Sequence, residues 1–268
     1  MDFVDIYILV LTLIIGLCVG SFLNVVIYRL PREMSFVKPA SHCTTCNYQL
    51  KWYDNIPVFS YLFLKGKCRK CGQKISIRYP LIEVLNMVLW FFCLLIFTDI
   101  IIKSNTNDYV MFGVSCIACS TLVCVFCCDL EHLEIPDQLQ VMLLILCLVS
   151  TFSNFVSVKE RVIGFLVGGG FFALIYYVFL AIKKRECLGW GDVKLMAVCG
   201  LVVGVYNTIL TILLSSIIGA IVLLILSKIK KEESNKEYPF AVFIVPACIL
   251  TLFVGQFIVS WYSSLFII

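Results

Sequence analysis

The chain has few charged side chains: aspartate, glutamate, lysine and arginine together make up 14% of its 268 residues. Soluble globular domains carry about 25% charged residues, and disordered chains are poor in apolar residues. Here 61% of the residues are hydrophobic and the mean hydropathy is +1.01. The composition therefore argues against a water-soluble protein, a disordered protein and a disulfide-stapled miniprotein.

Charge is missing above all from the long apolar stretches. A helix needs about 20 apolar residues to cross the hydrocarbon core of a bilayer. One stretch, 80–102, is interrupted only by Glu83 and Asp99. The pattern predicts an all-α polytopic membrane protein. The fully uncharged runs are 6–28, 109–128, 138–158, 162–182, 195–227 and 238–268.

The basic residues are unevenly distributed among the connections. Of the 21 lysines and arginines, ten lie between Arg29 and Arg78, four in 183–194 and four in 228–237. Basic loops stay cytoplasmic, so these three connections are expected in the cytosol. The acidic N-terminus, Met1–Asp5, is expected outside. It is not expected to be a signal peptide, since it lacks a basic segment before the apolar run and a small-residue cleavage site after it.

The same charge distribution predicts the number of helices. The run 195–227 is 33 residues long and would place its two basic flanks on opposite sides of the membrane if it were one helix. Two helices with a tight outside turn at 204–207 resolve this conflict. The first of these two helices would be short for a membrane span unless it begins near Trp190. The sequence therefore predicts about eight transmembrane helices in total, with both termini outside.

Four cysteines form two CxxC pairs in the first cytoplasmic connection, and these are Cys43, Cys46, Cys68 and Cys71. Two such pairs at this separation are typical of a structural Zn(Cys)4 site. Redox dithiols or two disulfides are the alternative, which a cytosolic location disfavours. A catalytic metal is disfavoured because four thiolates leave no open position. The remaining cysteines fall mostly in apolar runs and are interpreted as packing residues.

The predicted organisation has three parts. Residues 1–30 form the first transmembrane helix, and 31–79 form a small cytoplasmic zinc module. Residues 80–268 form a membrane domain of seven helices. The zinc module is too small to hold a core unaided, so metal binding is expected to supply much of its folding free energy.

Two acidic segments flank apolar runs on the predicted cytoplasmic face. Asp129 ends one run, and Asp192 opens another within Gly189–Lys194. An ionisable residue beside a membrane span indicates function. Two carboxylates held close together cannot both ionise cheaply, so one serves as general acid and the other as general base. Because the two can meet across a helix bundle, Asp129 and Asp192 are candidates for a catalytic pair of the kind that aspartic proteases use.

Other interpretations of these acids remain open. Asp137 follows a proline and suits the first turn of a helix, while Glu131 and Glu134 suit a solvated face. Together with Asp129 these acids could instead hold Mg²⁺ in a membrane transferase acting on a phosphorylated lipid, although no basic cluster beside them would receive the phosphates. A transporter with protonatable carboxylates is a third possibility, but the acids lie at the membrane edge and no repeat is visible.

Longer motifs make the chain similar to a known family. They are Gly20–Pro31, Trp52–Pro57, Ile75–Glu83, the segment from Asp129 to Asp137 containing Ile-Pro-Asp, and the Gly-x-Gly-Asp motif at 189–192. On these motifs the chain resembles the bacterial type IV prepilin peptidases, which are bifunctional leader peptidases and N-methyltransferases. One departure is the segment Pro239-Phe240-Ala241-Val242, where the family usually carries a second proline at the last position.

The resemblance implies a function more specific than the residues alone. Asp129 and Asp192 would cleave the leader of prepilins and pseudopilins at the cytoplasmic face of the bacterial inner membrane. Such a substrate would have a short basic leader ending in Gly, followed by an apolar helix. The same protein would methylate the new N-terminal amine with S-adenosylmethionine, an activity associated with the zinc module. No motif assigns residues to the methyl-donor site. The expected partners are these substrates and membrane lipid, with no nucleic acid. The basic leader is expected near Glu131, Glu134 and Asp137.

Overall fold

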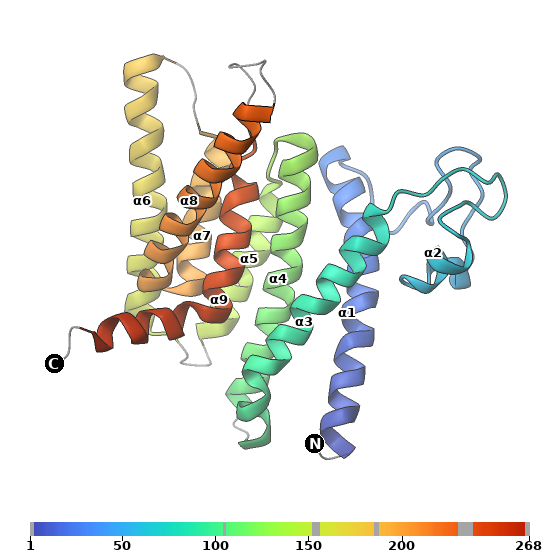
Figure 1. Ribbon diagram of the computed structural model, residues 1–268, viewed down its shortest axis with the longest axis horizontal. Coiled ribbons are helices and arrows are strands. Elements are labelled where there is room, and N and C mark those ends of the chain that lie inside the picture. The colour runs from blue at the N-terminus through green and yellow to red at the C-terminus, as the bar shows by residue number, and fades with distance from the viewer. Residues whose placement is uncertain (1–2, 104–105, 152–155, 185–187, 230–237, 266–268) are drawn as a thin grey trace. The chain divides into compact units, whose positions relative to one another are not determined.

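Helices supply the regular structure of the computed structural model, which describes residues 3–103, 106–151, 156–184, 188–229 and 238–265 (Figure 1). No strand occurs within these ranges; only two isolated β-bridges are found. The elements are α1 (Phe3–Arg29), η1 (Leu30–Arg32), η2 (Trp52–Asn55), α2 (Phe59–Phe63), α3 (Arg78–Lys103), α4 (Thr106–His132), α5 (Asp137–Thr151), α6 (Val158–Lys183), α7 (Trp190–Val203), α8 (Val205–Ile229) and α9 (Ala241–Ser264).

The prediction of an all-α polytopic membrane protein is confirmed. Six described helices, α1, α3, α4, α6, α8 and α9, are long and apolar enough to cross a bilayer. Helices α5 and α7 have 15 and 14 residues, which corresponds to lengths of only about 21–23 Å at 1.5 Å per residue. The count of eight spans stays a prediction, and most of the basic loop at 228–237 lies outside the described residues. The chain divides into two compact units, residues 1–103 and 104–268.

In the first unit, α1 and α3 pack together through small and polar residues. A Cβ atom at Gly20 would lie 2.7 Å from the Cα of Glu83, so the two backbones approach too closely for any larger residue. The Asn86 amide donates to the Gly16 carbonyl at 2.8 Å, and the Asn24 amide donates to the Tyr79 carbonyl at 3.1 Å. Small residues at the contact and side-chain amides across it are the usual means of joining membrane helices.

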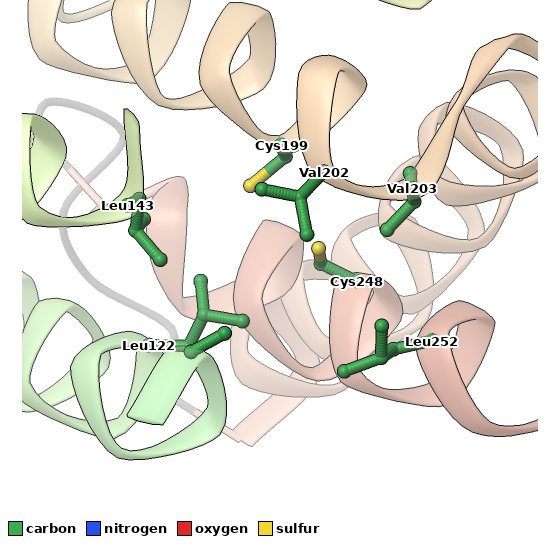
Figure 2. A pocket seen from close by; sticks show the side chains of 8 residues that line it. Leu122, Leu143, Cys199, Val202, Val203, Cys248 and Leu252 are labelled. Carbon is green, nitrogen blue, oxygen red and sulfur yellow. The ribbon is translucent and has the colours of Figure 1, made fainter. Parts of the chain in front are cut away.

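In the second unit, the short helix α7 is the centre of the packing. Figure 1 shows α4 to α9 as a bundle in which the end of α4 and the starts of α7 and α9 lie at the same end. Four helices, α4, α5, α7 and α9, meet around a cavity of about 10 Å³ lined by apolar and cysteine side chains (Figure 2). The volume is that of about one water molecule, so this region is a closed core rather than a binding site.

The predicted division of the run 195–227 is confirmed. Helix α7 begins at Trp190 and ends at Val203, and α8 begins at Val205. The residue between them, Gly204, has φ +79°, a conformation that glycine adopts without the penalty of a Cβ atom. The charge pattern of the flanking loops therefore located this turn correctly.

A buried arginine holds the ends of the two short helices. Arg161 in α6 is 2% exposed. Its guanidinium donates to the Ser150 hydroxyl and carbonyl in α5 at 2.8 and 3.3 Å, and to the Leu201 carbonyl in α7 at 3.1 Å. The last carbonyls of a helix lack partners within the helix and carry partial negative charge. Because α5 and α7 are short, their last carbonyls would lie within the membrane, where no water is available to donate hydrogen bonds. The Arg161 guanidinium donates these hydrogen bonds instead.

We expect Arg161→Met to lower the thermal stability of the detergent-solubilised protein strongly. The change removes the bonds that the guanidinium donates to the Ser150 hydroxyl and carbonyl and to the Leu201 carbonyl, and a hydrogen bond to a charged group is worth about 1.5–3 kcal/mol. Arg161→Lys should fall between wild type and Met, because an ammonium group reaches fewer acceptors. Lys159→Met is the matched control, since Lys159 is an exposed cation in the same helix turn. Equal melting temperatures for Arg161→Met and Lys159→Met would contradict this role.

Candidate active site and metal centre

Asp129 lies in the last turn of α4, in the second unit. The helix ends where Leu133 takes a left-handed conformation, with φ +56°, and its amide donates to the Asp129 carbonyl at 3.0 Å. This is the αL type of helix end. The Asp129 side chain itself points inward and is 4% exposed. An acid next to the end of an apolar helix is thereby held inside the bundle rather than in solvent.

Asp192 is the third residue of α7, after the N-cap Gly189. Its Oδ2 atom lies 3.2 Å from the position that a Cβ atom of Gly189 would take, and the Gly189 backbone amide interacts with its carboxylate. A side chain at this position that turns back to the N-cap amide is half of a capping box. Gly189 therefore leaves room for the carboxylate to fold against the backbone. Asp192 is 6% exposed.

The two carboxylates come together beside the start of α9. The charge of Asp129 acts directly on Asp192. The backbone amide of Ala241, the first residue of α9, interacts with both carboxylates, and the amide of Val242 interacts with Asp129. Ala241 is fully buried. Three helices thus contribute to one site: two supply acids, and the third supplies backbone donors at its N-terminus.

This arrangement suits acid–base chemistry on a peptide. Asp129 Oδ2 and Asp192 Oδ1 are buried and have no hydrogen-bond partner among the described residues. Two closely spaced carboxyl groups share one proton readily, so one can donate while the other accepts. Backbone amides at a helix N-terminus stabilise negative charge nearby. The amides at the start of α9 can therefore stabilise one ionised carboxylate of the pair.

The other acids of the segment do not join this pair. Glu131, Glu134 and Asp137 are exposed, and Asp137 forms an ion pair of 2.8 Å with Lys194 in α7. It stands in the first turn of α5, as the sequence suggests. Within the described residues, these acids form no cluster of the kind that holds a metal ion. The arrangement gives no support to a Mg²⁺-dependent transferase.

Sequence reasoning missed the contribution of Ala241. It treated the segment Pro239–Val242 only as a departure before the final helix. A proline followed by an apolar run marks a helix start, and a helix start carries free amide donors. That signal was present, but the sequence alone does not show that these donors face the two aspartates.

The four cysteines of the first unit converge as two matching turns. Their Sγ atoms all lie within 4.8 Å of one another, with Cys43–Cys71 at 3.8 Å and Cys46–Cys68 at 4.0 Å. In each turn the amide four residues after the first cysteine, Asn47 or Gly72, donates to that cysteine's carbonyl at 2.9 Å. Both residues have positive φ. The backbone thus makes the same tight turn twice.

The geometry fits a tetrahedral metal ion. Four sulfurs at about 2.3 Å from one zinc ion lie about 3.8 Å apart, which agrees with the shorter distances between facing turns. The backbone amides of Cys46 and Thr45 lower the pKa of the Cys43 thiol to about 6. The amides of Cys71 and Lys70 lower the pKa of Cys68 in the same way. The first cysteine of each turn is therefore favoured as a thiolate, the species that binds metal.

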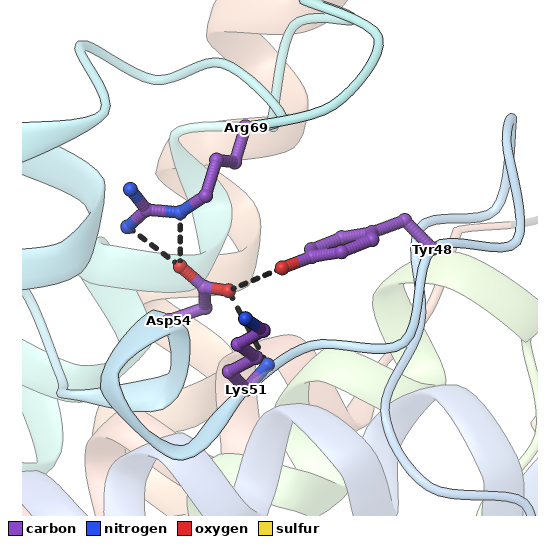
Figure 3. A network of polar contacts seen from close by, with 4 residues as sticks. All are labelled: Tyr48, Lys51, Asp54 and Arg69. Carbon is purple, nitrogen blue, oxygen red and sulfur yellow. Dashed lines mark hydrogen bonds and ion pairs between the residues drawn. The ribbon is translucent and has the colours of Figure 1, made fainter.

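A buried aspartate joins the two cysteine turns. The Asp54 carboxylate accepts from Arg69, between the second pair of cysteines, at 2.8 Å (Figure 3). Its other oxygen accepts from the Lys51 amide at 3.3 Å and faces the Tyr48 hydroxyl at 3.5 Å, just after the first pair. Asp54 is 7% exposed. Contacts outside the ligand set commonly orient metal-binding turns, and this network links them to η2.

The module is also tied to the membrane helix that follows it. The Glu83 carboxylate in α3 accepts from the Val58 amide at 2.7 Å. Val58 has φ +60° and ψ −50°, and the Phe59 amide donates to the Pro57 carbonyl at 2.6 Å. This three-residue turn is costly for a β-branched residue. The bond to a buried carboxylate helps to hold it.

Comparison with known proteins gives matches along most of the chain. The family model for the bacterial peptidase A24 N-terminal domain matches residues 14–97, and that of the Type IV leader peptidase family matches residues 116–224. The first match covers the cysteine module, and the second covers both aspartates. No solved structure matches the chain significantly.

The curated relatives carry one name, "prepilin leader peptidase/N-methyltransferase". The protein from Stutzerimonas stutzeri is 32% identical over 93% of this chain and 92% of its own length. That from Pseudomonas aeruginosa is 31% identical over 94% and 92%. The protein from Myxococcus xanthus is 37% identical over 78% of this chain, which spans 60% of that relative's length. The breadth of these alignments shows that the chain belongs to the Type IV leader peptidase family.

Proposed function

We propose that this protein removes the leader peptides of prepilins and pseudopilins and then methylates the new N-terminus. The observation that carries the peptidase proposal is the pairing of two buried carboxylates, Asp129 and Asp192, beside the amides that open α9. The names of relatives that align over nine-tenths of their length support both activities.

In the proposed reaction, the ionised aspartate takes a proton from a water molecule while the water oxygen bonds to the scissile carbonyl carbon. The protonated aspartate stabilises the developing oxyanion by donating to it. When the tetrahedral intermediate collapses, the carbon–nitrogen bond breaks and the leaving amine takes a proton from the acid group. The pair thus ends the cycle with one proton between them, as it began.

The methylation proposal rests on the relatives' names, and S-adenosylmethionine would supply the methyl group. Cys43, Cys46, Cys68 and Cys71 would hold a structural zinc ion that maintains the shape of the module. The proposed location is the bacterial inner membrane, with both termini outside and the cysteine module in the cytosol. The concentration of basic residues in three connections supports this orientation.

The experiment that tests the function uses membranes containing this protein and a purified prepilin. We expect cleavage directly before the apolar helix of the substrate, detected by mass spectrometry of the product. Addition of S-adenosylmethionine should increase the product mass by one methyl group. An intact prepilin after prolonged incubation, with the protein shown to be folded, would contradict the peptidase proposal.

Removing the Ala241 amide should slow cleavage by about 10- to 100-fold, the scale of a lost hydrogen bond to a charged group. Ala241→Pro makes this change at the first position of α9, whose amide has no acceptor within the helix. Val242→Pro is the control: it removes an amide that serves Asp129 alone and restores the proline usual in this family.

Both proline variants restrict the backbone of the preceding residue in the same way. The difference between their cleavage rates therefore measures the effect of the Ala241 amide, which both carboxylates share. Cleavage rates and melting temperatures should be measured together. Equal loss of activity in the two variants, at equal stability, would show that the Ala241 amide has no special role.

A further inference from the structure

We propose that the groove between α5 and α6, with α7 as its floor, binds the apolar helix of the substrate. The inference rests on the proposed function and extends it from the reacting aspartates to the rest of the prepilin. The groove has a volume of about 590 Å³. Two turns of helix with side chains fill about 1,000 Å³, from a diameter of 10–12 Å and a pitch of 5.4 Å, so one face of a helix fits into it.

The walls of the groove suit a transmembrane helix. Its sides are Val141 and Leu144 of α5 together with Leu166 of α6, and all three are exposed on the bundle surface. Gly169 and Ala173 lie one helical turn apart in the lining of α6. Small residues with this spacing let a second helix approach closely in a membrane.

The floor connects the groove to the active site. It is formed by Val193, Ala197 and Val198, on the same helix as Asp192. At the end nearest the aspartates the lining includes Trp190 and Gln140, and the Gln140 amide donates to the Gly191 carbonyl at 3.4 Å. A helix lying along α7 therefore has its end beside the Gly-x-Gly-Asp segment, where cleavage is proposed.

The position of the mouth favours a prepilin over a phospholipid. Asp137 lines the mouth with a 70% exposed side chain, paired with Lys194. Because an exposed ion pair is weak, a basic leader residue can take the place of Lys194 at Asp137, just as a phosphate could take the place of Asp137 at Lys194. The mouth lies beside the Gly-x-Gly-Asp segment through Trp190 and Gln140, so a substrate cleaved there must lay the apolar helix that follows its leader along this groove.

Replacing Gly170 by a larger residue tests the groove without disturbing the fold. A Cβ atom added there would meet nothing within 4 Å, and Gly170 lines the groove. Gly113 in α4 is the matched control, since it is equally open and lies outside the groove lining. Gly170→Leu should raise KM for a full prepilin by about tenfold, the scale of one obstructed packing contact. Gly113→Leu should leave KM unchanged.

A second substrate separates groove binding from damage to the active site. A short leader peptide that ends soon after the cleaved bond has no helix to dock, so Gly170→Leu should process it as wild type does. Equal slowing of both substrates, or of neither, would overturn the inference. If wild type cleaves neither substrate, the proposed function itself fails.

Cross-linking tests the groove without cleavage. A photo-reactive residue at position 170, combined with Asp192→Asn, should form adducts with the helix of a bound prepilin. The same probe at position 113 should not. Adducts only with phospholipid, or only with residues 1–103 of the same chain, would identify another occupant and refute the proposal.

Discussion

Replacing either Asp129 or Asp192 by Asn should reduce prepilin cleavage by at least about a thousandfold, as expected for removal of one member of a catalytic unit. Asparagine keeps the shape of the side chain and can neither take the proton of water nor return it. The double variant should be little slower than either single one. Residues that act as a unit show this non-additivity, since the second change removes what the first has already disabled.

The control is Glu160→Gln, which makes the same carboxylate-to-amide change in the first turn of α6. It should cleave prepilin at the wild-type rate. Each variant should also be tested for melting temperature, because an unpaired buried carboxylate is costly and its neutralisation can stabilise the fold. Cleavage above about a tenth of the wild-type rate in either single variant would argue against a shared catalytic unit, because such units lose far more.

The architecture could be predicted from the sequence where a long-range rule applied. The positive-inside rule compares connections far apart in the chain, so it divided 195–227 into two helices, which are α7 and α8. The cysteine spacing was equally informative, since two CxxC turns carry their own local geometry. In both cases the physical constraint can be recognised in the sequence without knowing how the helices pack.

Features that depend on packing could not be predicted. The role of Arg161 could not be predicted, because the sequence does not show that α5 and α7 end beside it. The role of the Ala241 amide and the groove along α7 could not be predicted for the same reason. Each needs the relative placement of three helices, which apolar periodicity does not specify when nearly every helix face is apolar.

Replacing Cys68 by Ser should remove the metal from the cysteine module. A serine hydroxyl stays protonated and is a poor ligand for zinc, so the site loses one of its four thiolates. Wild type should contain one zinc ion per chain by atomic spectroscopy, and the variant close to none. Cys18→Ser is the control, because Cys18 is an exposed cysteine in α1 of the same unit.

The loss should unfold the module and leave the peptidase largely intact. Between η1 and α3 only Asp54, Gly66 and Cys68 are buried, so there is almost no apolar core to replace the metal, whose binding contributes about 10–16 kcal/mol in small zinc domains. Limited proteolysis should therefore cut within 33–77, and methylation should fall more than cleavage. Cys68→His should retain zinc and protection, since a Cys3His set also binds it. Full protection of Cys68→Ser, or a wild-type protein that contains two disulfides or iron and sulfide, would rule out structural zinc.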